Sequence, residues 1–241
     1  MTNGFGFGGV ADLYDEVRPG YPAGLGERLL DFHGDRPREI VEPAAGTGKA
    51  TELLVTLGAP VTCIEPDPRM VSILRAKFPN VPVVLSTFEE WTPPPGGVDM
   101  IACACGWHWL DPASRARLAH AALTPGGTLA IFRHHYAFAD PAVERVIGAA
   151  FRAADPDSGE RIEPDPAAEL TAFSQVVTEV SGDHHDYPRE RYLQLVQTFS
   201  PFRRHSPSRQ AAVLKSVGAA LDGLGGSVVL DLRTTLVLAR A

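Results

Sequence analysis

The sequence contains little lysine, little cysteine and no long uninterrupted apolar segment. Of its 241 residues only three are lysines, Lys49, Lys77 and Lys215, and acidic residues outnumber basic ones by 29 to 22, which gives a net charge of −7. A protein that binds a phosphate backbone or an anionic lipid surface needs a basic footprint. We therefore expect neither a nucleic acid nor a membrane as a partner.

The three cysteines, Cys63, Cys103 and Cys105, are few and odd in number, which argues against a disulfide scaffold. Each lies in an apolar stretch typical of a strand, where a free cysteine packs as a small hydrophobic residue. The Gly- and Phe-rich residues 1–9 lack the basic start and the apolar run of a signal peptide. These features favour a cytoplasmic protein.

Short apolar segments alternate with helical patterns along the chain, and hydrophobic residues make up 44% of it, enough for a buried core. The alternation predicts βαβ units. We expect a doubly wound, Rossmann-like α/β fold with a seven-stranded, mostly parallel sheet and an antiparallel closing strand. The predicted strands are residues 39–42, 60–65, 81–85, 98–104, 128–133, 176–180 and 227–238. The predicted helices are residues 23–33, 50–57, 68–78, 112–123, 141–153, 189–199 and 207–222.

A turn of small residues, Ala44 to Gly48, separates the first strand from the next helix. Ligands of parallel sheets bind beyond the carboxyl ends of the strands, so this turn is a candidate site. A P-loop would need Gly and then Ser or Thr where the chain has Pro43 and Ala50. A dinucleotide fingerprint would need Gly or Ala in place of Thr51. The remaining interpretation is a nucleoside cofactor without phosphates.

Glu65 ends the second strand, 19 residues after Gly46. In Rossmann-type sites an acidic residue about 20 positions past the glycines binds a ribose. A carboxylate there can accept charge-assisted hydrogen bonds from both ribose hydroxyls. We therefore predict that Glu65 binds the ribose.

Together these motifs resemble the class I S-adenosylmethionine-dependent methyltransferases, in particular the small-molecule enzymes called type 11. The resemblance covers residues 5–133 and is carried by segments 42–48, 63–67, 86–90, 98–110 and 123–129, in that order and spacing. Residues 14–22 are similar to the N-terminal cap of a subset with compact substrates. The family usually has Gly where this chain has Ala44, which would cost about 1 kcal/mol if its φ is positive.

The resemblance implies S-adenosylmethionine as cofactor and gives its parts separate binding residues. Ribose would meet Glu65, the methionine part would meet the glycines of a turn oriented by Glu42, and adenine would lie between Pro66 and Phe88. Tyr14 and Arg18 would close over the methionine carboxylate. The full cofactor-binding set is Tyr14, Arg18, Glu42, Ala44, Gly46, Gly48, Glu65, Pro66, Phe88 and Glu89, the last facing the adenine amine.

Two histidines are candidates for a general base that takes a proton from the acceptor. His108 follows the fourth strand, and His134 leaves the fifth within a pair that we place in a loop. The alternative for His108 is a packed, hydrogen-bonded side chain, and the alternative for His134 is a loop position at the edge of the site without a catalytic role. The predicted substrate-binding residues are Trp107, Trp109, His135 and Tyr136.

We predict no metal site. The segment from Asp183 to Asp186 has metal-ligand residue types, but neighbours on a strand point to opposite faces, so we interpret it as a solvated turn. Cys103 and Cys105 would share a strand face, yet no second cysteine pair completes a zinc site.

The resemblance implies one methyltransferase domain over residues 1–241. Its expected parts are an N-terminal cap (1–38), a cofactor-binding core (39–133), a helical lid insertion (134–174) and the C-terminal part of the sheet with its helices (175–241). The predicted function is in-line methyl transfer to a small-molecule acceptor in a lidded cleft. The alternatives are a non-catalytic or regulatory protein that binds the cofactor or its product, and a nicotinamide-dependent oxidoreductase, which Thr51 disfavours. The oligomeric state is left unassigned.

Overall fold

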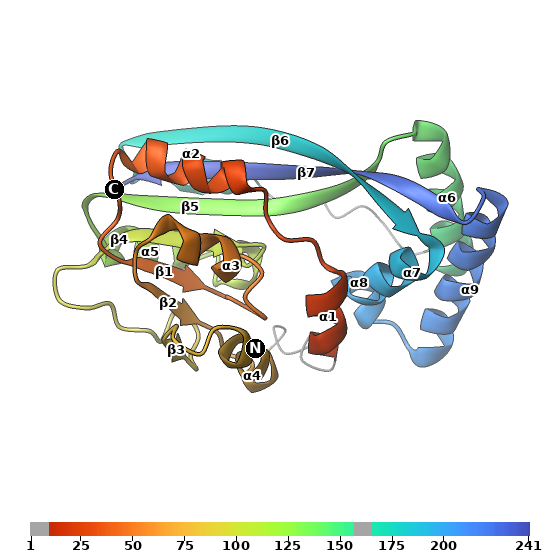
Figure 1. Ribbon diagram of the computed structural model, residues 1–241, viewed down its shortest axis with the longest axis horizontal. Coiled ribbons are helices and arrows are strands. Elements are labelled where there is room, and N and C mark those ends of the chain that lie inside the picture. The colour runs from red at the N-terminus through yellow and green to blue at the C-terminus, as the bar shows by residue number, and fades with distance from the viewer. Residues whose placement is uncertain (1–9, 157–164) are drawn as a thin grey trace. The chain divides into compact units, whose positions relative to one another are not determined.

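The computed structural model describes residues 10–156 and 165–241. Within them, strands form one sheet in the order β3-β2-β1-β4-β5-β7-β6 (Figure 1). The strands are β1 (Ile40–Pro43), β2 (Val61–Ile64), β3 (Val83–Val84), β4 (Val98–Ala104), β5 (Leu123–Phe138), β6 (Gln175–Pro188) and β7 (Ser227–Arg240). The helices are α1 (Ala11–Val17), α2 (Ala23–His33), α3 (Thr51–Leu54), α4 (Pro68–Lys77), α5 (Arg115–Ala122), α6 (Pro141–Ala154), α7 (Arg189–Gln197), α8 (Ser200–Arg203) and α9 (Pro207–Gly223), with one-turn helices η3 (Val55–Leu57), η4 (Trp107–Trp109) and η5 (Pro166–Glu169).

The sheet is parallel except for β7, which confirms the predicted fold class. Ile40 of β1 lies opposite Val61 of β2 and Met100 of β4 in parallel register. Against β5, the strand β7 runs the other way, since the N–H of Gly126 donates to the carbonyl oxygen of Ala241 at 3.0 Å. All four residues of β1 are buried, as expected for a central parallel strand.

Local signals account for the helices that begin after an aspartate. Asp67 caps α4 by accepting a hydrogen bond from the N–H of Arg69 at 2.9 Å, and Pro68 follows it. Asp140 and Pro141 begin α6 in the same way. Proline at the first helical position has no N–H to leave unpaired, so both helices begin where the sequence predicts.

The structure differs most from the predictions at α1, β5 and β6. The helix α1 lies where no helix was predicted. The strand β5 begins at Leu123, ahead of the predicted residue 128, and runs on to Phe138. The strand β6 runs on to Pro188, because β5 and β6 both flank the long β7 in the sheet. Just past the end of β6, the N–H of Arg189 donates to the carbonyl oxygen of Gly226, which precedes β7, at 2.9 Å. Cys105 falls just outside β4, with a φ of 52°.

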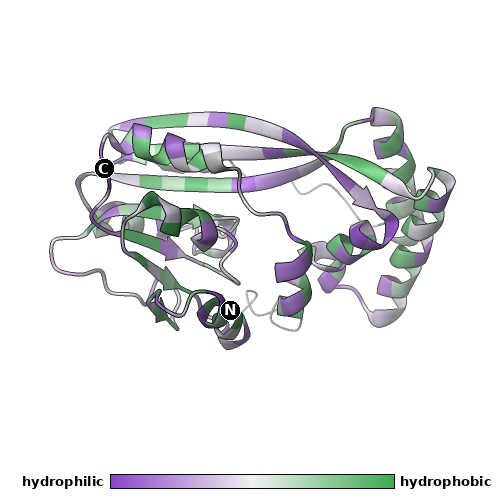
Figure 2. Cartoon of the chain, in the orientation of Figure 1, coloured by the Kyte–Doolittle hydropathy of each residue, from purple (hydrophilic) through white to green (hydrophobic). Residues whose placement is uncertain are grey.

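The chain divides into two compact units. Residues 134–162 and 180–234 form the second, and the remainder forms the first, so β5, β6 and β7 contribute to both. Along β5, hydrophobic colour gives way to hydrophilic colour before the strand ends (Figure 2). In the second unit α6 packs against α9, and Ser216 Oγ donates to the carbonyl oxygen of Ala150 at 2.9 Å.

The predicted lid, residues 134–174, includes α6, and part of it lies outside the described residues. Residues 1–9 of the predicted N-terminal cap (1–38) also lie outside them. Its role as a lid stays a prediction. Among the described residues, no helix combines the length and the apolar character needed to cross a bilayer.

The turn after β1 depends on positive φ angles. Ala44 has a φ of 53°, so the backbone strain that was expected for a positive φ at this residue is present. Its methyl carbon lies 2.6 Å from the position that a Cβ on Gly106 would occupy. Gly46 and Gly48 have φ of 58° and 88°. A Cβ on Gly48 would lie 2.6 Å from Leu74, whereas a Cβ on Gly46 would meet no described atom within 4 Å.

These two glycines give a matched test. Gly48→Ala is expected to lower the free energy of unfolding by about 2–4 kcal/mol, because it adds a clash to backbone strain. Gly46→Ala adds only the strain, about 1 kcal/mol. Urea unfolding of both variants measures the difference, and equal losses would show that packing of the turn on α4 does not matter.

Asp99 joins three segments of the first unit. Its carboxylate accepts hydrogen bonds from the N–H and the side chain of Arg38 at 2.7–2.8 Å, and from Thr124 Oγ1 at 3.1 Å. The hydrogen bonds from the Arg38 side chain hold the pKa of Asp99 well below its usual range, although burial opposes them.

Asp99→Asn is therefore expected to destabilise the protein by about 1 kcal/mol at neutral pH, a modest value because Arg38 is largely exposed. The folded pKa lies below the unfolded value of about 3.9, so this contribution is complete above about pH 4 and is lost as the pH falls through the folded pKa. Urea titrations at neutral and acid pH check this. Asp31→Asn, which removes an exposed carboxylate, serves as the control, and a loss of equal size there would contradict the prediction.

Candidate active site at the ends of β1, β2 and β4

The carboxylate of Glu65 connects the ends of the first two strands. Glu65 is buried and directly follows β2. Its Oε2 accepts from the N–H of Gly46 at 2.9 Å, and its Oε1 accepts from the N–H of Asp67 at 2.9 Å. Burial raises the pKa of Glu65, and these two N–H groups oppose the rise. Each oxygen keeps a further lone pair, so Glu65 can still accept from ligand hydroxyls.

Helix α1 brings Tyr14 and Arg18 to the same end of the sheet. The Arg18 guanidinium lies 5.0 Å from the centre of the Tyr14 ring. Burial raises the pKa of the Tyr14 phenol; the charge of Arg18 opposes the rise, and Cys105 and Glu65 add to it. Cys105 follows β4 and Glu65 follows β2, so groups after both strands act on the pKa of this phenol. The role of Tyr14 and Arg18 at a ligand carboxylate stays a prediction.

Glu42 is buried in β1 at the base of the turn. Its Oε2 accepts from Thr51 Oγ1 at 2.5 Å and from Cys63 Sγ at 3.6 Å. Burial raises the pKa of Glu42 to about 8; the two hydrogen bonds oppose this, and the nearby Glu65 adds to it. The hydrogen bonds that were expected to orient the turn thus reach Thr51, where α3 begins.

The residues predicted around adenine differ in accessibility. Phe88 is buried, and its ring stacks on Trp91 with 6.0 Å between ring centres. Glu89 Oε1 accepts from the N–H of Asp111 at 2.7 Å, which ties the segment after β3 to the segment after η4. Pro66 is half-buried next to Glu65 in the chain. Adenine contacts by Pro66, Phe88 and Glu89 stay predictions.

Helix η4 presents one buried and one exposed candidate. Trp107 is buried; its indole N–H donates to Glu169, and Arg115 Nη1 donates to its carbonyl oxygen at 2.7 Å. His108 is exposed, and its ring centre lies 4.8 Å from that of Trp109. The indole of Trp107 therefore belongs to the core, and a substrate wall formed by η4 depends on Trp109. His108 is accessible to a substrate, and its role as a base stays a prediction.

His134, His135 and Tyr136 belong to the second unit and lie inside β5, so the placement of the histidine pair in a loop was wrong. His134 Nδ1 lies 3.0 Å from Thr234 Oγ1, and the Tyr136 ring centre lies 5.4 Å from that of Phe199. Neighbours on a strand point to opposite faces, so His135 faces away from the side that carries His134 and Tyr136. At most one of the two histidines can therefore line a given cavity; their functional roles stay predictions.

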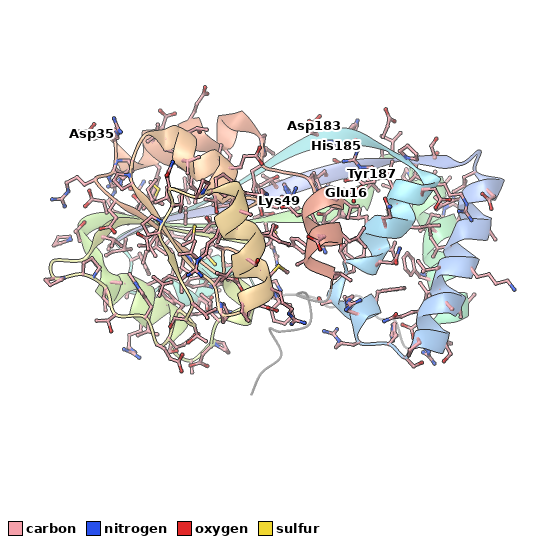
Figure 3. All side chains as sticks on the ribbon, turned by 60° about the horizontal axis from the view of Figure 1, so that its bottom comes forward. Glu16, Asp35, Lys49, Asp183, His185 and Tyr187 are labelled. Atoms are coloured by element: carbon pink, nitrogen blue, oxygen red, sulfur yellow. The ribbon has the colours of Figure 1, made fainter. Side chains whose placement is uncertain are left out.

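The segment from Asp183 to Asp186 lies in β6, so its interpretation as a turn was also wrong. Asp183 and His185, both labelled in Figure 3, share one strand face with 3.6 Å between His185 Nε2 and Asp183 Oδ2. His184 Nε2 lies 4.0 Å from Asp231 on the neighbouring β7. Within the described ranges, 10–156 and 165–241, no cluster of three or more potential ligand side chains could hold a metal ion.

Sequence reasoning missed two contributions to the site. Thr51 counted only as a mismatch to the dinucleotide fingerprint, yet its hydroxyl is the partner of Glu42. Asp15 of α1 pairs with Lys77 at 2.6 Å and with Lys49 at 3.9 Å. The scarcity of lysine in the sequence was the signal that could have pointed to this contact, because two of the three lysines meet at the Asp15 carboxylate.

Glu42→Gln is expected to change how stability depends on pH. The folded pKa of Glu42, about 8, lies above the unfolded value of about 4.3, so the folded state binds more protons between these two values. The free energy of unfolding of the wild type should then fall as the pH rises through this window, by at most about 1.4 kcal/mol per pH unit. Gln cannot ionise, so the variant should lose this slope and gain relative stability toward pH 8. Urea titrations across the window test this, with the exposed Glu52→Gln as control; parallel curves for wild type and Glu42→Gln would contradict it.

Relatives of known family share this arrangement of strands and turns. Residues 40–127 match the family described as methyltransferase domain. An uncharacterised methyltransferase of Mycobacterium tuberculosis is 36% identical over 125 residues, which are 52% of this chain and 50% of that protein. The chain spans about half the length of the curated relatives that it matches.

Solved structures share the fold. A protein of Anaeromyxobacter dehalogenans, described as a candidate type II methyltransferase, has a TM-score of 0.71 at 19% identity, over 92% of this chain and 97% of that chain. A phosphoethanolamine N-methyltransferase of Haemonchus contortus, in complex with phosphomonomethylethanolamine and S-adenosylhomocysteine, has a TM-score of 0.55 at 11% identity, over 97% of this chain and 57% of that chain. The resemblance to class I S-adenosylmethionine-dependent methyltransferases is confirmed, and the assignment to the type 11 enzymes stays a prediction. Over residues 40–127 the chain carries a methyltransferase domain of the class I S-adenosylmethionine-dependent family.

Proposed function

We propose that the protein transfers a methyl group from S-adenosylmethionine to a small-molecule acceptor. The family of residues 40–127 supports the reaction class. The net charge of −7 argues against a polyanionic acceptor such as a nucleic acid. The Haemonchus contortus enzyme holds a small phosphorylated amine, which is a property of that protein and supports a small acceptor here by analogy.

The ends of β1 and β2 fit this cofactor. The position of a Cβ on Gly46 is clear of described atoms within 4 Å, so the turn leaves room for a ligand beside its backbone. Next to that space, Glu65 offers carboxylate lone pairs suited to two ribose hydroxyls. The hydrogen bond between Glu65 and the N–H of Gly46 is the observation that carries the proposal, because it places the acidic side chain at the edge of the open turn.

When bound, S-adenosylmethionine supplies a methyl group on a positively charged sulfur, which is already activated for transfer. The residues of the chain bind and orient the reactants. Glu65 would hold the ribose, and Gly46 would let the methionine part approach the backbone. Tyr14 and Arg18 would bind its carboxylate and help to exclude water. Holding the acceptor in line with the methyl group can lower the barrier by roughly 7–11 kcal/mol.

The side of the site after β4 would serve the acceptor. His108 is exposed there and would remove a proton from an oxygen or nitrogen acid, while Trp109 would pack against the acceptor. His134 is the second candidate base, with Thr234 as its hydrogen-bond partner. A lid formed by residues 134–174 and a cytoplasmic location belong to the same proposal.

Glu65→Ala is expected to weaken binding of S-adenosylhomocysteine by about tenfold or more, because lost hydrogen bonds to a charged group cost about 1.5–3 kcal/mol. Calorimetric titration measures the change. Glu52→Ala, which removes an exposed carboxylate from α3, is the matched control. Circular dichroism shows whether the turn that Glu65 supports still allows the chain to fold.

Equal dissociation constants for wild type and Glu65→Ala would refute the role of Glu65. A wild-type protein that binds a nicotinamide dinucleotide but neither S-adenosylmethionine nor its product would overturn the proposed function. Binding without turnover across a broad acceptor panel would instead support the non-catalytic alternative.

A further inference from the structure

Two of the three lysines in the chain converge on one carboxylate oxygen of α1. Asp15 Oδ1 lies 2.6 Å from Lys77 Nζ and 3.9 Å from Lys49 Nζ, and the three side chains are only 21–27% exposed. Lys49 belongs to the turn after β1, and Lys77 is the last residue of α4. A compact ammonium suits this geometry, since two of them can approach one oxygen, whereas the fork of arginine favours a whole carboxylate.

The helix that carries Asp15 has little stability of its own. It is seven residues long, no side chain caps its N-terminus, and its buried residues are Ala11 and Val17. Helices this short are marginal in water unless tertiary contacts hold them. The ion pairs of Asp15 add to the packing of Ala11 and Val17 that holds α1 in place.

The same ion pairs are linked to the packing of the turn. Lys77 Nζ lies 5.6 Å from the centre of the Phe78 ring. That ring also lies 2.7 Å from where a Cβ on Gly48 would be, so it packs directly on the turn. Asp15 thus joins α1 to Lys49, which follows Gly48 of the turn. It also joins α1 to Lys77, which lies beside the Phe78 ring that packs on the turn.

We propose that Asp15 is a positioning residue for the cofactor. Its pairing with Lys49 and Lys77 forms a latch that keeps Tyr14 and Arg18 of α1 next to Glu65, and the latch sets how fast bound cofactor leaves. Asp15 acts through α1 and takes no part in the transfer itself. This inference rests on the proposed function, because it concerns the same cofactor.

The latch should be sensitive to salt. Ion pairs that are about a quarter exposed are screened in part, and the screening length falls from about 10 Å at 0.1 M salt to about 3 Å at 1 M. Added KCl should therefore speed the dissociation of S-adenosylhomocysteine from the wild type, and it should do so less for a variant that lacks the latch.

Asp15→Asn is the direct test, with S-adenosylhomocysteine as the probe and the full chain as the protein. We expect the dissociation constant to rise about threefold, mainly through a faster dissociation rate, as partly exposed ion pairs contribute up to about a factor of five. Glu16→Gln is the matched control, because Glu16 is exposed on the same helix; Figure 3 labels it together with Lys49. Calorimetry gives the affinity, and stopped-flow displacement gives the rate.

Two further variants separate positioning from general stability. Asp15→Glu keeps the charge and should restore most of the slow dissociation. Lys77→Gln should resemble Asp15→Asn, and the double variant should be little worse than either single one, since both remove the same contact. The salt dependence should be weaker in each variant that lacks the pair.

The proposal is overturned if Asp15→Asn and Glu16→Gln dissociate at the same rate. It is also overturned if Asp15→Asn lowers the melting temperature while the salt dependence of dissociation stays as in the wild type, because Asp15 then serves stability alone. A wild-type protein that binds no S-adenosylhomocysteine refutes the proposed function instead, which is a separate outcome.

Discussion

The ligand end of the sheet depends on the two hydrogen bonds that Glu65 accepts from backbone N–H groups. One comes from Gly46 in the turn after β1, and the other from Asp67, the residue that caps α4. The carboxylate thus adds to the backbone pairing of β1 and β2 a link from the turn to the start of α4. Burial is the main cause of the raised pKa values of Glu42 and Tyr14, and Glu65 adds to both. A single side chain therefore contributes to both the backbone hydrogen bonding and the electrostatics of the site.

Much of the fold could be predicted because its signals are local. The Asp-Pro pairs before α4 and α6 mark the first residue of each helix, and the apolar stretch of β4 matches the strand residue for residue. The helix α1 lacks a capping side chain and depends on Asp15, whose partners lie 34 and 62 positions away. The lengths of β5 and β6 come from pairing with β7, which periodicity within either strand cannot show.

The residues of the site likewise divide into those that local sequence predicts and those whose position depends on distant segments. The spacing between the small-residue turn and Glu65 reflects the geometry of one βαβ unit, so their meeting could be foreseen from the sequence. The burial of Trp107 depends on Glu169, which is 62 residues distant, and on Arg115. The histidines of β5 were misplaced because the strand continues through a polar stretch that alone resembles a loop. Contacts between distant segments therefore decide which candidate side chains remain accessible.

Ala44 and Gly106 form one steric unit although they follow different strands. The methyl group of Ala44 fills the space that a side chain at position 106 would need. This end of the sheet therefore needs a glycine in the segment after β4, in addition to the glycines of the first turn. In laboratory evolution, residue 44 would act as a permissive position: glycine there removes the nearest obstacle to a side chain at residue 106, and Cys103 Sγ, 3.2 Å from the same point, then limits which residues fit beside Trp109.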